Sequence, residues 1–189
     1  AAKVEALASQ INPHFLFNSL NNIYALCHRN NDSESAEAIA KLSGLMRYML
    51  FGSATSTVNL KDEIEYLQNY LDLQKMRINK DIEVRFVVKG EIEGFQIAPL
   101  LLIPFVENAF KYGLSYVSNS YVRIECLVST DQLKFSVQNT IHERGKTELS
   151  SGIGLENVKR RLALLYPGKH NLIINDTKDI FDVELTLNA

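Results

Sequence analysis

The spacing of the apolar residues changes near residue 80, and this change limits the possible folds more than any other feature of the chain. Before it, apolar residues recur at steps of three and four, the period of amphipathic helices. Residues 82–88 instead alternate between apolar side chains and others that include Glu83 and Arg85, as a strand does. We therefore predict an α+β chain with an all-helical module in residues 1–80 and a mixed module in residues 81–189.

Three helices are expected in the first module. Pro13 interrupts the apolar stripe of the first helix, so the proline either kinks that helix or starts it with Asn12 as the cap. Asp32 or Ser33 can cap the second helix. The third, residues 60–76, carries acidic residues in its first turn, where negative charge is favourable for the helix dipole.

The second module combines strands with helices. The patterns predict a sheet covered by helices on one face, an α/β sandwich. Strands are expected at residues 82–88, 121–128, 132–138, 171–175 and 181–187, and helices at residues 100–112 and 155–166.

The composition is that of an ordinary folded protein. Hydrophobic residues make up 46% of the chain and charged residues 22%, with a net charge of −2, which argues against disorder and against a nucleic-acid partner. Cys27 and Cys126 have no metal-type spacing and are interpreted as small core residues in a reducing compartment. No apolar run approaches the roughly 18–20 residues that cross a bilayer.

Residues 10–18, Gln-Ile-Asn-Pro-His-Phe-Leu-Phe-Asn, are the most informative stretch. A histidine that accepts phosphate needs an exposed imidazole that is neutral near pH 7. A lone helical histidine is usually an ordinary surface or core residue. The proline before His14 and the amides on both sides of it are unusual in an apolar stripe, and they make His14 a candidate acceptor.

Two further stretches carry candidate ligands. Glu107, Asn108 and Lys111 lie close together on one otherwise apolar helix, where they form either a half-exposed polar face or an oxygen-ligand site for Mg²⁺. Gly152 and Gly154 lead into the last helix, either as a simple turn or as backbone that approaches a phosphate at a helix N-terminus.

Taken together and in this order, the three stretches resemble the sensor histidine kinases of the LytS type. That family combines a helical phospho-acceptor segment with a GHKL (Bergerat) ATP-binding domain, and the resemblance covers nearly all of the chain. The block around His14 is highly specific to the family. Residues 106–109 resemble its N box, and residues 152–158 with 160–162 resemble its second glycine box.

The resemblance implies roles for individual residues. His14 would be phosphorylated, Asn108 would bind Mg²⁺, and Glu107 would lie near the metal and the water. ATP would lie between the helix that carries Asn108 and the loop of residues 140–154, with nucleotide contacts from Asn108, Lys111, Asn139, Gly152, Gly154 and Leu155. The basic residues of that loop, His142, Arg144 and Lys146, form either a mobile lid over the phosphates or a solvated loop.

Two positions depart from the family pattern. Asn139 stands where the family usually has an aspartate that accepts a hydrogen bond from the adenine amino group, and the glycine two positions later is missing. An asparagine oxygen can still accept that bond, but a neutral bond is weaker, so nucleotide binding weaker by roughly tenfold is expected. Tyr112 replaces the histidine before the glycine that ends the N box.

A second copy of the chain is expected from the residues, and the other partners are implied by the resemblance. A homodimer is expected, because the apolar stripes of residues 1–80 are too exposed for a monomer. The phosphate would pass to the receiver aspartate of a response regulator, and the chain would be the cytoplasmic domain of a probable inner-membrane protein. Two alternatives remain: a degenerate, non-catalytic dimeric signalling scaffold that binds nucleotide weakly, and a GHKL ATPase that hydrolyses ATP.

Overall fold

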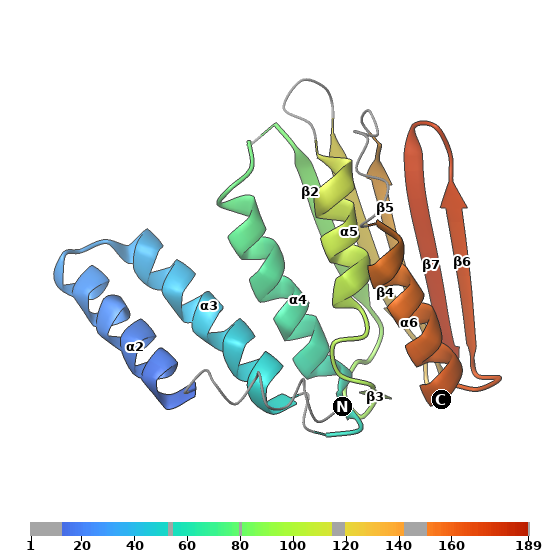
Figure 1. Ribbon diagram of the computed structural model, residues 1–189, viewed down its shortest axis with the longest axis horizontal. Helices are drawn as coiled ribbons and strands as arrows, with labels where there is room; N and C mark the ends of the chain where they lie inside the picture. Colours follow the sequence, from blue (N-terminus) through green and yellow to red (C-terminus); the bar gives the residue numbers. More distant parts are fainter. Residues whose placement is uncertain (1–12, 53–54, 80, 115–119, 142–150, 189) are drawn as a thin grey trace.

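The computed structural model describes residues 13–52, 55–79, 81–114, 120–141 and 151–188. Figure 1 shows helices α2, α3 and α4 side by side, followed by a sheet with α5 and α6 on one face. The described helices are α2 (Pro13–Arg29), α3 (Ser33–Phe51), α4 (Leu60–Lys75), α5 (Ile103–Gly113) and α6 (Ser151–Leu165). The strands are β1 (Val58–Asn59), β2 (Glu83–Lys89), β3 (Gln96–Ile97), β4 (Tyr121–Val128), β5 (Gln132–Thr140), β6 (His170–Asp176) and β7 (Ile180–Asn188).

The helical part forms where its caps and spacing predict it. Asp32 is the N-cap of α3, and its side chain accepts a hydrogen bond from the Ser35 backbone N–H at 3.0 Å. Helix α2 packs against α3, and α3 packs against α4. The described part of the first helix begins at Pro13, so the choice between a kink and an Asn12 cap lies outside the described residues.

The sheet has five strands in the order β2-β4-β5-β7-β6. Strands β2 and β4 are parallel, and the other neighbours are antiparallel. Asn139, near the end of β5, pairs with Val122 on one side and with Phe181 on the other. Strands β1 and β3 form a separate two-stranded ladder next to α4.

One core joins the helices to the sheet. Alternate residues of β4 are buried, and they share the core with α5 and α6. Leu67 and Leu71 of α4 belong to the same core, although they precede residue 80. Fully burying a large apolar side chain contributes about 1.5–3 kcal/mol, so α4 is firmly held to the sheet part. The predicted fold class is confirmed, while the domain boundary near residue 80 stays a prediction.

Two local predictions differ from the structure. Helix α6 begins at Ser151, so Gly152 and Gly154 lie inside its first turn and do not lead into it. Helix α5 begins at Ile103, because Leu100 just before it has a φ of 54°, which a helix does not accommodate. Glu63 is buried in the core, although an acidic residue in a first turn usually reaches water. No described helix has the length and apolar character that crossing a membrane requires.

Candidate functional site

Helix α5 presents the predicted polar residues on the side away from the sheet. Its buried side is apolar and includes Phe105, Val106 and Ala109. Glu107 is exposed, and Asn108 is half-buried. A helix with this division buries its apolar stripe on the sheet and leaves its polar residues near the solvent.

The carboxyl group of Glu107 faces helix α4. Partial burial raises its pKa above the usual value, although the side chain as a whole is exposed. Burial raises the pKa of both Tyr66 and Tyr70 to about 12, and the charge of Glu107 adds to this effect. Glu107 therefore lies in a partly desolvated strip between α4 and α5.

Lys111 places a positive charge on the same helix. Its Nζ lies 4.9 Å from the centroid of the Tyr112 ring, within the range of a cation–π contact. Glu107, Asn108 and Lys111 thus lie within about one turn of α5, as the sequence predicts.

Asn139 lies beneath the end of α5. It is 1% exposed, and its Nδ2 donates to the Thr140 carbonyl oxygen at 2.7 Å. This bond fixes the orientation of the amide, because only the nitrogen can donate to a carbonyl. Its Oδ1 is buried and has no hydrogen-bond partner among the residues that the structure describes. A buried acceptor without a donor is costly, so this oxygen suits a ligand that carries an N–H group.

The close approach of α5 and β5 depends on Gly113. A Cβ atom at this position would lie 2.7 Å from Nδ2 of Asn139. The Thr140 hydroxyl also donates to the Gly113 carbonyl oxygen at 2.9 Å. The end of the helix that carries Asn108 is therefore fixed directly over Asn139.

The first turn of α6 contributes glycine backbone. Among the residues that the structure describes, an added Cβ at Gly154 would meet no atom within 4 Å. Leu155 packs partly against the core, and Val158 is buried in it. The side chains of residues 151–153 and all of residues 142–150, which include the predicted lid residues, lie outside the described residues.

His14 lies on helix α2, apart from the residues of α5. It is exposed, and its Nδ1 lies 3.3 Å from Nδ2 of Asn18 one turn later. Helices α3 and α4 lie between α2 and α5 (Figure 1). The structure therefore groups the residues of α5 with Asn139 but does not bring His14 to them within one chain.

Sequence reasoning missed a set of residues around the segment of residues 98–102, which leads into α5. Glu63 and Tyr48 contact this segment from one side, and Arg161 and Tyr166 from the other. Only the acidic residue in the first turn of α4 stood out in the sequence, as a charge that is favourable for the helix dipole.

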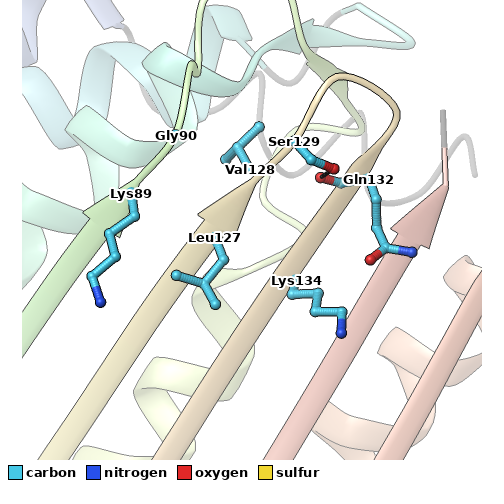
Figure 2. A pocket seen from close by; sticks show the side chains of 7 residues that line it. All are labelled: Lys89, Gly90, Leu127, Val128, Ser129, Gln132 and Lys134. Atoms are coloured by element: carbon cyan, nitrogen blue, oxygen red, sulfur yellow. Dashed lines mark hydrogen bonds between the residues drawn. The ribbon is translucent and has the colours of Figure 1, made fainter.

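One pocket of about 220 Å³ lies away from all of these residues. Figure 2 shows Lys89, Leu127 and Lys134 in a row across β2, β4 and β5, near the turn between β4 and β5. Leu127 is exposed between the buried Cys126 and Val128, so the row points to the sheet face that α5 and α6 leave open. This pocket contains none of the predicted site residues.

The described residues contain no group of three or more His, Cys, Asp or Glu that could hold a metal ion. A cation that used Asn108 would need further ligands, which a bound molecule and water can supply. Mg²⁺ binds in this way, because it commonly uses one or two protein ligands together with phosphate oxygens. The oxygens of α5 fit such a partial site.

Comparison with known proteins found relatives over most of the chain. Residues 2–82 match the family model described as histidine kinase. The chain is 32% identical over 189 residues to the sensor protein LytS of Enterococcus faecalis, covering 93% of this chain and 32% of that protein. It is 30% identical to the sensor histidine kinase BtsS of Escherichia coli, covering 85% of this chain and 28% of that protein.

The fold has solved counterparts. The histidine kinase domain of the blue-light activated histidine kinase from Erythrobacter litoralis EL346 superposes with a TM-score of 0.51 at 16% identity, covering 88% of this chain and 84% of that one. Fold and sequence together define the class, that of the protein histidine kinases. Within that class, the chain belongs with the LytS-type sensor histidine kinases, of which it spans about a third of the length.

Proposed function

We propose that this chain is the catalytic core of a two-component sensor kinase, which transfers the γ-phosphoryl group of ATP to His14. The observation that carries the proposal is the pairing of α5 with Asn139. A helix with oxygen ligands on its open side ends directly over a buried acceptor that lacks a donor among the described residues. This pairing suits a nucleotide with its base at Asn139 and its phosphates beside α5.

Residues of β5, α5 and α6 would contact different parts of the nucleotide. Asn139 Oδ1 accepts a hydrogen bond from the adenine amino group, and Lys111 balances phosphate charge. The backbone at Gly152 and Gly154 offers N–H groups at the start of α6, and Leu155 packs beside them. Because Asn139 is almost fully buried, its neighbours must open for the base to reach it.

Asn108 would hold Mg²⁺ through its side-chain oxygen, with Glu107 beside it. Bound Mg²⁺ supplies charge neutralisation for the phosphates. Partial burial raises the pKa of the Glu107 carboxyl, and a nearby cation would favour its charged form. Most of the catalysis in phosphoryl transfer is positioning and charge stabilisation, which these residues are placed to provide.

His14 would supply the attacking nitrogen. The lone pair of the neutral imidazole attacks the γ-phosphorus, the bond from that phosphorus to the bridging oxygen breaks, and ADP leaves with the electron pair. Asn18 contacts Nδ1 of His14, and its amide can donate or accept. Asn18 can therefore determine which ring nitrogen carries the proton and which one attacks.

A homodimer would bring the acceptor and the nucleotide together. Because α3 and α4 separate α2 from α5 in one chain, His14 reaches ATP either by a movement of α2 and α3 or from a second subunit. Helices α2 and α3 expose several large apolar side chains, a pattern typical of an interface. The most exposed of them are Phe15, Ile23, Leu26, Met49 and Phe51.

The phosphate would then pass to the receiver aspartate of a response regulator, and the chain would be the cytoplasmic part of a membrane-anchored protein. The support comes from relatives named as sensor proteins, which are about three times as long as this chain.

A second candidate is a signalling scaffold that binds nucleotide weakly. The replacement of the usual aspartate by Asn139 favours it, because the bond to adenine loses its charge assistance. Incubation of the purified protein with ATP labelled on the γ-phosphate, in the presence of Mg²⁺, separates the candidates. A kinase acquires stable protein label, a scaffold acquires none, and an ATPase releases free phosphate.

A further inference from the structure

Glu63 is a fully buried carboxylate that joins three parts of the chain. It is 0% exposed, although it lies in the first turn of α4. Its Oε1 accepts from the Leu102 backbone N–H at 3.0 Å. Its Oε2 accepts from the Leu100 N–H at 2.9 Å and from the Tyr48 hydroxyl at 2.6 Å. A buried charge is tolerated only when donors replace its water, and these three donors do so.

The segment that receives these bonds is strained and leads directly into α5. Leu100 has a φ of 54°, which is rare for a side chain of this size and persists only where the surroundings enforce it. Arg161 of α6 donates to the carbonyl oxygens of Pro99 and Leu100 at 2.7 and 3.0 Å. The Tyr166 hydroxyl accepts from the Ala98 N–H at 2.7 Å. Side chains from α4 and α6 therefore hold this segment from both sides.

Glu63 also serves the N-terminus of α5. Leu102 occupies the N-cap position of this helix and makes no side-chain cap hydrogen bond. The first N–H groups of a helix favour a nearby negative charge, and Glu63 supplies one from another helix. The start of α5 therefore depends on Glu63, as does the placement of Glu107 and Asn108 about one turn later.

Tyr48 extends this connection to the helices that carry the acceptor. It lies on α3, which packs against α2, the helix of His14. Its ring packs against Tyr66 of α4 with 5.0 Å between the centroids. Helices α2 and α3 form a helical hairpin. The hydroxyl of Tyr48 thus links this hairpin to the Glu63 carboxylate, which holds the start of α5.

We propose that Glu63 is a positioning residue for phosphoryl transfer, and that its hydrogen bond with Tyr48 aligns helix α5 with the helices α2 and α3. This role rests on the proposed kinase function. The residue acts through the backbone at Leu100 and Leu102 and does not touch the nucleotide. The bond from Tyr48 to Glu63 fixes the position of the hairpin of α2 and α3 relative to α5. The two backbone bonds to Glu63 fix the position of the start of α5.

The substitution Tyr48→Phe tests the link, because it removes the hydroxyl and keeps the ring packing on Tyr66. We expect the autophosphorylation rate at saturating ATP to fall about tenfold, as the loss of a hydrogen bond to a charged group allows. The ATP concentration that gives half the maximal rate should stay within about twofold, since α5 keeps its two bonds from Glu63. Tyr121→Phe is the matched control, because its hydroxyl bonds Gln138 at 3.3 Å on the open face of the sheet. This control should keep the wild-type rate.

Amide hydrogen exchange at Leu100 and Leu102 separates positioning from general loosening. In Tyr48→Phe both amides should keep their wild-type protection, whereas Glu63→Gln should expose both. A wild-type rate in Tyr48→Phe overturns the positioning role and leaves the kinase function intact. A slower rate accompanied by weaker ATP binding or by lost protection also overturns it, because the bond would then only stabilise the fold. If the wild-type protein forms no phosphohistidine, the proposed function fails and this role fails with it.

Discussion

Gly113 of α5 lies so close to Asn139 of β5 that a methyl group on the glycine would overlap the asparagine. The added atom would lie 2.7 Å from Nδ2, 2.8 Å from Cβ and 2.9 Å from Cγ of Asn139. Real side chains essentially never approach this closely, so one of the two elements would have to move. This contact fixes the end of α5, the candidate metal-binding helix, against Asn139, the candidate adenine-binding residue.

Gly113→Ala should therefore affect both stability and nucleotide binding. We expect a loss of about 1–3 kcal/mol in the free energy of unfolding, because the added methyl group would overpack a buried site. ATP affinity should fall as well, since Asn139 is displaced. Gly44→Ala is the control: its nearest neighbour would lie at 3.5 Å, and alanine in a helix interior should stabilise α3 by about 0.5–1 kcal/mol. Urea denaturation of both variants measures the difference. Equal stability of Gly113→Ala and the wild-type protein would contradict the contact.

Asn139→Leu should weaken ATP binding about tenfold, because the adenine amino group loses its acceptor on leaving water. GTP should bind the wild-type protein more weakly than ATP. It presents a carbonyl oxygen where ATP has the amino group, and the amide is held in one orientation by Thr140. The variant should discriminate less between the two nucleotides.

Calorimetric titration with ATP and GTP checks this prediction. Gln138→Leu is the control, since its side chain lies on the other face of β5 and bonds Tyr121. Unchanged ATP affinity in Asn139→Leu would mean that Asn139 does not face the base, and the scaffold candidate would gain support.

Asn108→Asp keeps an oxygen ligand but changes the charge and removes the amide donor. We expect autophosphorylation to drop at least about 100-fold, the usual cost of losing a well-placed catalytic contact. The thermal midpoint should hardly change, because Asn108 is only half-buried. Asn171→Asp, an exposed change on β6, is the charge-matched control. Normal turnover of Asn108→Asp at every Mg²⁺ concentration would place the metal elsewhere.

Local patterns predicted the elements of this fold well. The strand predicted at residues 121–128 has the same bounds as β4, and Asp32 caps α3 as its position predicts. These features depend on neighbours in the sequence. The buried state of Glu63 could not be predicted, because its donors are 15, 37 and 39 residues away.

The candidate site likewise contains features that local sequence predicts and features that depend on long-range packing. The grouping of Glu107, Asn108 and Lys111 follows from helical spacing alone. The separation of His14 from α5 follows from how α3 and α4 pack, which no local pattern encodes. The resemblance to a known family suggested Asn139, but its contact with Gly113 depends on long-range packing between α5 and β5.

Mixed dimers should reveal how His14 reaches ATP. We expect His14→Gln protein, which keeps its nucleotide site, to phosphorylate Asn108→Asp protein, which keeps its acceptor, when the two are combined. The reason is that α3 and α4 separate α2 from α5 within one chain. Label on a size-tagged Asn108→Asp subunit measures the transfer. No label in the mixture, with both variants dimeric, would mean that His14 receives phosphate from its own subunit after a movement of the helices.

The chemistry of the labelled residue tests the central claim most directly. After incubation with γ-labelled ATP and Mg²⁺, the protein should carry label that is lost in acid and kept in base, as a phosphorus–nitrogen bond requires. His14→Gln should abolish this label and leave ATP binding unchanged. His28→Gln, on the same helix and also exposed, should keep the label. Full labelling of the His14→Gln protein, or label that resists acid, would contradict the assignment of His14 as the phospho-acceptor.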